Sequence, residues 1–453
     1  MKISLFSVSK FFLFAALFSV VIVTSSTLFP FIVGKYVWFR VTVELSFVFF
    51  LLGILFQDFK VPEIAGTHGL VSKRLRAILK EPLVIAVTFF VALYLLAGFF
   101  GYDPKASFWS NFERGEGGFQ LLNFYIFFLM LRTLFTTQKD WKNFFGVSLV
   151  VSGLVILYGV AASLGMKGFI GPSGFCGRVS GSLGNPAYFA PYLMFTGFFA
   201  LWLWFSKREG KNTARNIGYA FLIFVLFFFF LLSQTRGTFL GLGVGVIAAF
   251  GYLFLKLEKS KLKTVSGFVA LVLMLLGVLG FMLRHNNIPI VPFCSSSSRL
   301  LEISTKDETA QTRFWTWGSA IKGWEERPLL GWGPENFSVV FDKYFDPRHF
   351  VPGRPSETWF DRAHSVYFDY LTETGILGLL SYLGIFGVYF WEFFKKTKER
   401  SPIINVLFFA IPIAYLTQGI ALFDVLPIYL VLFTTLAFAS FYFNLQEEKT
   451  HIL

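Results

Sequence analysis

Long apolar runs separated by short polar segments recur along the whole chain. A helix of about 20 apolar residues is long enough to cross a bilayer. We count twelve candidate spans, which start near residues 11, 36, 82, 118, 143, 187, 217, 239, 264, 366, 403 and 428. The tenth is the least apolar, because its first turns, 366–375, include Asp369 and Glu373. The pattern predicts an all-α integral membrane protein, and the first span is expected to be an anchor because no small-residue cleavage site follows it.

One long polar segment interrupts this pattern. It divides the chain into a membrane domain of nine spans (1–283), a loop (284–363) and a second membrane domain of three spans (364–453). Inside the loop, aromatic residues recur at helical spacing over 313–327 and again over 337–344. We expect two amphipathic helices there, whose aromatic faces suit a membrane interface. They would lie over the outer leaflet like a lid.

Basic residues are distributed unevenly between the two sides of the predicted spans. The clusters at 73–80, 206–211, 256–263 and 395–400 all fall on one side. Cytoplasmic loops carry such an excess, so both chain ends are expected in the cytoplasm and the 284–363 loop outside. The net charge of +13 then reflects topology, and we expect membrane lipids and no nucleic acid as partners. With 55% hydrophobic residues, the chain is too apolar for a soluble domain of this length.

The predicted outer side holds both cysteines, Cys176 and Cys294. An oxidising compartment permits a disulfide between them, and two unbridged thiols fit the sequence equally well. Cys176 lies in a glycine-rich loop, 165–186, in which Arg178 is the only interior charge after Lys167. This loop either folds back over a cavity or is a flexible connector.

Three basic residues occupy positions that need an explanation. Arg236 stands where the seventh span ends and the eighth begins, Arg313 opens the first loop helix, and His364 precedes the tenth span. Each has an ordinary alternative: an arginine reaching to lipid headgroups, a solvated surface arginine, or a satisfied polar histidine. As a functional set, the arginines would bind an anion, and the histidine is suited to proton transfer near neutral pH.

Motifs for metals and nucleotides are missing from the sequence. The outer loops contain no HExxH, paired CxxC or similar ligand cluster, and the chain has no GxxxxGK phosphate loop. We therefore expect a reaction that uses no cofactor.

Four stretches together resemble the O-antigen ligase family, whose superfamily also contains O-antigen polymerases and bacterial protein O-oligosaccharyltransferases. They are RVSGSLGNPAYFAPYL (178–193), SQTRGTFLGL (233–242), RFWTWGSAIKGWEERPLLGWGPENF (313–337) and AHSVYFDYLTETGILGLLSYLG (363–384). The last two are the most specific. One departure is Thr235, which stands where many members have serine and keeps the hydroxyl.

The resemblance implies an enzyme of the bacterial inner membrane whose active site faces the periplasm. Such an enzyme transfers O-antigen polysaccharide from undecaprenyl diphosphate to a hydroxyl of lipid A-core or another glycolipid. Carried over to this chain, Arg236 and Arg313 would bind the diphosphate, with Arg178 as a weaker addition. His364 would activate the acceptor as general base, and Glu373 would support packing or orientation.

Other functions stay open at this point. A polymerase would use the same donor site, and protein O-glycosylation is a third reading. From a different class, a polysaccharide or ion transporter would place Arg236 and Arg313 along a translocation path. Transport predicts polar residues through the bilayer centre of several spans, whereas here they gather at the outer face, so the sequence favours the ligase.

Overall fold

The computed structural model describes residues 4–59, 70–111, 114–172, 174–206, 212–258, 261–282, 294, 308–350 and 358–445. The long helices are α1 (Leu5–Ala16, extended by the 3-10 turn η1, Leu17–Val21), α2 (Val33–Phe59), α4 (Pro82–Phe99), α6 (Gly118–Leu134), α7 (Gln138–Ser163), α8 (Pro186–Ser206), α9 (Thr213–Leu232), α10 (Arg236–Lys256), α11 (Lys261–Met282), α12 (Glu308–Glu326), α14 (Val366–Lys396), α15 (Pro402–Gln418) and α16 (Leu426–Asn444). The short ones are α3 (Leu70–Ile78), α5 (Pro104–Trp109), η2 (Gly181–Leu183), α13 (Phe337–Lys343) and η4 (Pro347–His349).

The helices confirm the all-α membrane fold. Each predicted span coincides with an apolar helix, and within the described residues eight helices are long and apolar enough to cross a membrane. Three further apolar helices are shorter: Leu5–Val21, Gly118–Leu134 and Pro402–Gln418. Crossing by all twelve predicted spans stays a prediction, as does the side that each loop faces.

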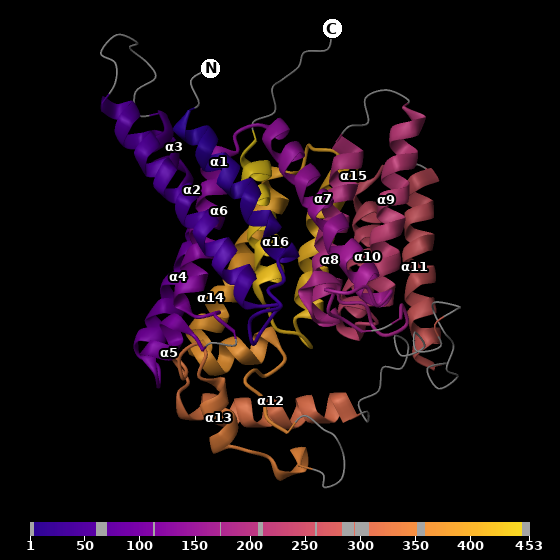
Figure 1. Cartoon of the computed structure of the whole chain (residues 1–453). Coiled ribbons are helices and arrows are strands. Elements are labelled where there is room, and N and C mark those ends of the chain that lie inside the picture. Colours follow the sequence, from indigo (N-terminus) through magenta and orange to yellow (C-terminus); the bar gives the residue numbers. More distant parts are fainter. Residues whose placement is uncertain are drawn as a thin grey trace.

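The loop helices α12 and α13 lie beyond one end of the helical bundle, which we call the loop end (Figure 1). α1 begins and α16 ends at the opposite end. The basic clusters likewise predicted that the two chain ends lie on the side opposite the large loop. The predicted domain boundary at 283/284 lies outside the described residues.

The aromatic faces of α12 and α13 differ from the prediction. Phe337 and Phe341 of α13 are fully buried, and they form a small separate core with Ala320, Phe360 and Ala363. Phe314 of α12, in contrast, is 42% exposed. The aromatic residues of α13 therefore pack on their neighbours in the loop, where burial removes their apolar surface from water.

The loop turn before α13 is inserted into a break in α14. Gly375 has φ 65° and ψ −171°, which interrupts the helix. The backbone groups released by the break pair with the turn: Trp332 N and Gly333 N donate to the carbonyls of Thr372 and Glu373 (3.0 and 2.8 Å). In return, Ile376 N donates to the Pro328 carbonyl (2.8 Å). Because buried backbone groups need partners, this exchange fixes the loop to the first turns of α14.

Glycines of α10 form a close-packed seam with α15. A Cβ at Gly241 would lie 2.6 Å from the Ala414 carbonyl oxygen, and one at Gly245 would lie 2.8 Å from Ala414 Cβ. Small residues allow this close approach of backbones. The seam holds the first residue of α10, Arg236, at the loop end.

The glycine-rich loop between α7 and α8 is packed on the helix ends. Its residues Val179, Ser180 and Leu183 are buried, and Val179 N donates to the Leu232 carbonyl (3.1 Å). A disulfide joins Cys176 of this loop to Cys294, with the two Cα atoms 5.3 Å apart. The loop is therefore an anchored segment of the loop end and not a flexible connector.

Candidate active site

His364 lies at the loop end, two residues before α14. Its φ of 57° is in the left-handed region, which only a few per cent of non-glycine residues adopt. The ring packs edge-on against Phe360 and Phe423, with centroids 5.2 and 5.1 Å away. Nδ1 lies 3.2 Å from the Arg362 carbonyl oxygen. A carbonyl can only accept, so Nδ1 carries the hydrogen and Nε2 keeps the lone pair.

The imidazole of His364 is neutral over the physiological range. Burial lowers the pKa of His364 to about 4, because the charged ring loses hydration. The hydrogen bond to the Arg362 carbonyl opposes this shift, and the positive charge of Arg313 adds to it.

Arg313 lies on α12, close enough to His364 for its charge to act on the ring. The helix begins at Glu308, so Arg313 occupies its second turn and does not open it as predicted. One turn further on, Trp317 Nε1 donates to the carbonyl of Ala363 (3.0 Å), and its ring stacks on Phe368 at 4.8 Å. These contacts fix α12 beside the residue that precedes His364.

Arg236 begins α10, whose first turn contacts the loop that packs on His364. It is half-buried at the start of α10. The next residue, Gly237, faces the α15–α16 loop, where a Cβ would lie 3.5 Å from Leu422. The Leu422 carbonyl accepts from Val366 N (3.0 Å), and the adjacent Phe423 packs on His364. One short loop therefore connects the beginnings of α10 and α14.

Arg178 lies in the packed glycine-rich loop, where Nε donates to the Ser233 carbonyl (3.4 Å). Gln234 Nε2 donates to the carbonyl of Cys176 (3.2 Å), which ties the same loop to the α9–α10 turn. Arg178 is therefore placed beside the turn that carries Arg236. The structure thus places Arg313 near His364, and Arg178 near the start of α10.

A buried ion cluster supports the backbone on which His364 stands. Arg362 pairs with Glu335, with Glu373 (3.1 Å) and with Glu116 (3.4 Å). Burial alone would lower the pKa of Arg362, but the three carboxylates raise it well above its ordinary value. Glu373 also accepts from Glu335 N (3.0 Å), so it links Arg362 to the backbone of the loop turn.

A second arginine, Arg114, lies next to the site. It makes a two-pronged ion pair with Asp361 (Nε–Oδ2 2.7 Å, Nη2–Oδ1 3.0 Å). Its guanidinium also lies over the Phe423 ring, 5.4 Å from the centroid. Asp361 is occupied by this pair, and the pKa of its carboxyl is lowered despite burial, because Arg114 stabilises the charge.

Positive φ angles of non-glycine residues collect around this site. In the described part of the chain they occur at Ser110, Arg178, Gln234, Glu335 and His364. Ser110 Oγ donates to Glu335 (2.6 Å), which joins it to the ion cluster. Such conformations cost about 1–3 kcal/mol each and persist where the surroundings enforce them, commonly at functional sites.

Sequence reasoning missed Arg114, Glu116, Glu335 and Arg362. Arg362 stands two residues before His364, so its proximity was visible, but its partner Glu116 is 246 residues away. The GWGP turn was recognised, yet nothing local shows that Glu335 directly after it points at Arg362. Among the described residues, no group of three or more His, Cys, Asp or Glu side chains has the arrangement of a metal site.

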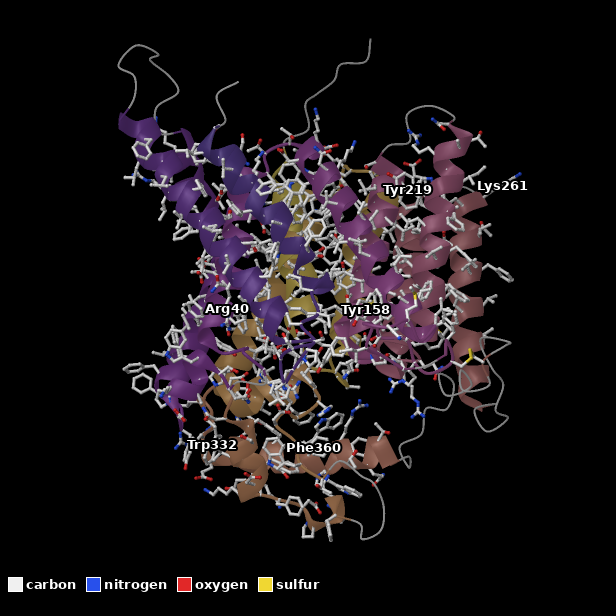
Figure 2. All side chains as sticks on the ribbon, in the orientation of Figure 1. Arg40, Tyr158, Tyr219, Lys261, Trp332 and Phe360 are labelled. Atoms are coloured by element: carbon white, nitrogen blue, oxygen red, sulfur yellow. A yellow bond between two sulfur atoms is a disulfide. The ribbon has the colours of Figure 1, made fainter. Side chains whose placement is uncertain are left out.

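The apolar helices define a multi-span membrane protein, and Phe360, which packs on His364, lies at the loop end of the bundle (Figure 2). Residues 220–383 match the model of the family described as O-antigen ligase, which confirms the family that the sequence motifs predicted. The matched region contains Arg236, Arg313, His364 and Glu373. No curated protein matches the chain.

The match supports a membrane enzyme of glycosyl transfer, like those of the superfamily of O-antigen ligases and polymerases. It implies lipid-linked glycan and glycolipid substrates.

Proposed function

We propose that the protein is a ligase-type glycosyltransferase of the bacterial inner membrane, acting at the periplasmic face. It moves O-antigen polysaccharide from undecaprenyl diphosphate to a hydroxyl of lipid A-core. The observation that carries this proposal is the neutral His364, whose Nδ1 is held by a carbonyl while Arg313 acts on the same ring.

In the proposed step, His364 Nε2 takes the proton of the acceptor hydroxyl. The oxygen attacks the anomeric carbon of the donor, and the bond from that carbon to the diphosphate oxygen breaks. Undecaprenyl diphosphate leaves with the electron pair, and the proton remains on His364. The energy comes from the glycosyl phosphate bond, so the reaction needs no nucleotide.

The diphosphate is a good leaving group that needs charge neutralisation more than a proton. Arg236, Arg313 and Arg178 supply it, because guanidinium groups bind phosphate oxygens in pairs. Arginines in these positions replace a metal, and activity should therefore persist in excess chelator. A strict requirement for Mg²⁺ or Mn²⁺ would reduce the arginines to a minor role.

Asp361 and Glu373 are weaker candidates for the base. Asp361 is paired with Arg114, and Glu373 with Arg362, so each carboxylate is already engaged by a cation. His364 accepts a proton without breaking an ion pair.

The polymerase is the second candidate, because the family model covers the superfamily and the donor site would be the same. Deleting the gene distinguishes the two functions. Lipid-linked polymer that accumulates without reaching lipid A-core indicates a ligase, whereas single repeat units on the carrier indicate a polymerase. A transporter would catalyse no transfer. Purified protein in vesicles that contain both donor and acceptor would then leave the two substrates unchanged.

A further inference from the structure

An open groove lies beside α2 and α5, which Figure 1 shows on the opposite side of the bundle from α9, α10 and α11. It has a volume of about 490 Å³ and lies between the first turns of α2, the short helix α5 and the segment before α6. Its lining includes Tyr36, Val37, Arg40, Lys105, Trp109 and Arg114. None of these residues belongs to the donor site proposed above.

The described lining of the groove is positively charged. Arg40, Lys105 and Arg114 face it, and Asp103 is the carboxylate among the described lining residues. The Asp103 carboxylate caps α5 by accepting from the backbone N–H of Lys105 (2.9 Å) and the next residue. Arg40 is held in place by the Gly115 carbonyl (2.6 Å). Arg114 is also paired with Asp361, but Arg40 and Lys105 keep the lining positively charged, and a cationic concave surface attracts an anionic group.

The groove continues into a surface suited to lipid chains. Trp109 at its rim is 56% exposed, and tryptophan is enriched where headgroups meet hydrocarbon. From Val37 onwards, α2 exposes Val41, Leu45 and Val48 at helical spacing. These residues form one apolar stripe that leads away from the groove along the bundle. A ligand with a polar anionic head and long acyl chains matches both parts.

Arg114 connects the groove to His364. It lines the groove and also a smaller cavity that contains Tyr36, Glu116 and Tyr188. Its other side pairs with Asp361 and lies over Phe423, the ring that packs on His364. A headgroup in the groove is therefore separated from the imidazole by two side chains, Arg114 and Phe423.

We propose that this groove binds the acceptor, an anionic glycolipid, with its charged head against Arg40, Lys105 and Arg114 and its acyl chains along α2. The inference rests on the proposed function. It gives the two lipid substrates separate approaches: the donor from the side of α10, and the acceptor from the side of α2 and α5. The acceptor hydroxyl then meets His364 without displacing the donor.

A kinetic test uses the exposed pair Lys105→Glu with Trp109→Ala. The assay varies purified lipid A-core glycolipid in phosphatidylethanolamine vesicles at a fixed, saturating amount of lipid-linked polymer. We expect KM for the glycolipid to rise roughly tenfold or more, because a reversed charge repels the headgroup. The KM for the donor and kcat should stay within about twofold.

A matched control exists at the other end of α14. Lys395 lies over Trp391, with 4.7 Å between Nζ and the ring centroid, and both side chains are exposed. Lys395→Glu with Trp391→Ala makes the same chemical change far from the groove and should leave both KM values unchanged. A rise in donor KM for the groove variant would assign the groove to the donor and overturn the proposal.

A binding test that needs no turnover separates this inference from the proposed function. A photoreactive residue at Val37, in the His364→Ala background, should crosslink the glycolipid in preference to phosphatidylglycerol in mixed vesicles. Equal crosslinking of both lipids would mean that the groove holds bulk lipid, which overturns the proposal. The variant could crosslink the glycolipid selectively while the wild type transfers no polymer. That result would refute the proposed function and leave the glycolipid site intact.

Discussion

The turns of α14 before Gly375 and the turns after it bury different kinds of side chain. The first part buries Asp369, Thr372 and Glu373, which are held by hydrogen bonds and ion pairs at the loop end. The second part buries aromatic residues, among them Phe386, Tyr389 and Phe393. One continuous segment thus combines a polar scaffold with an apolar membrane helix, divided by a single glycine.

This difference shows how a position is fixed in each environment. In the apolar part, rings pack against neighbouring helices, as where Tyr389 stacks edge-on with Phe443 at 5.1 Å. Such packing tolerates small shifts, because dispersion is not directional. In the polar part, Arg362 and its carboxylates hold the backbone by directional bonds. His364 stands on the part with directional bonds, which suits a group that must meet a reacting atom.

The largest expected effect comes from removing the reacting group on the polar side. His364→Ala should lower the transfer rate by about 10²–10⁴-fold, the range typical of general-base help. Steady-state rates and donor binding check this, and donor affinity and thermal unfolding should stay close to those of the wild type. Near-normal turnover, or a loss confined to donor affinity, would make His364 a binding residue and require another base.

The ion cluster should dominate the stability of the polar part. Arg362→Met leaves three buried carboxylates without their cation, which should destabilise the protein by about 3–5 kcal/mol. Thermal unfolding in detergent measures this loss. The control is Lys395→Met in the apolar part, an exposed position where we expect a change within about 0.5 kcal/mol. Equal effects of the two changes would remove the distinction between the parts.

The boundary residue itself offers a sharper comparison. A Cβ at Gly375 would overlap the Leu329 carbonyl, and its φ and ψ lie in a region that is essentially restricted to glycine. Gly375→Ala should therefore cost about 1–3 kcal/mol from backbone strain alone. Gly384→Ala, in the apolar part with open space around the new methyl, should be neutral or stabilise by up to about 1 kcal/mol. Thermal unfolding of both variants measures these changes in stability. A Gly375→Ala variant as stable as the wild type would contradict the inserted turn.

The smallest effect is a shift in pH dependence. With a pKa of about 4, His364 stays neutral from pH 8 to about 5, so the transfer rate should be level there and fall only near pH 4 as the ring protonates. Arg313 lowers this pKa, so Arg313→Gln should move the acid limb of the pH–rate profile to higher pH. An unchanged limb would show that Arg313 does not act on His364.

The positions of the helices were predictable because apolar runs of this length have few alternatives. The sequence also singled out His364 and Arg313, since each stands in a local motif, and the structure places them near each other; their roles stay predictions. The ion cluster could not be predicted, because Arg362 and Glu116 are far apart in the chain. No periodic pattern links a loop arginine to a carboxylate that precedes another helix. The start of α12 was placed too late because aromatic spacing, and not the polar first turn from Glu308, guided the prediction.

The disulfide at the loop end has a consequence for how the protein is made. Cys176 and Cys294 are 118 residues apart, and the helices α8, α9, α10 and α11 lie between them. At about 5–20 residues per second, the ribosome needs roughly 6–24 s to add Cys294 after Cys176. During that interval Cys176 waits for its native partner while four apolar helices are synthesised. The bridge thus marks a late stage of assembly, and pulse-labelled chains should pass from a thiol-reactive form to an unreactive one only after that delay.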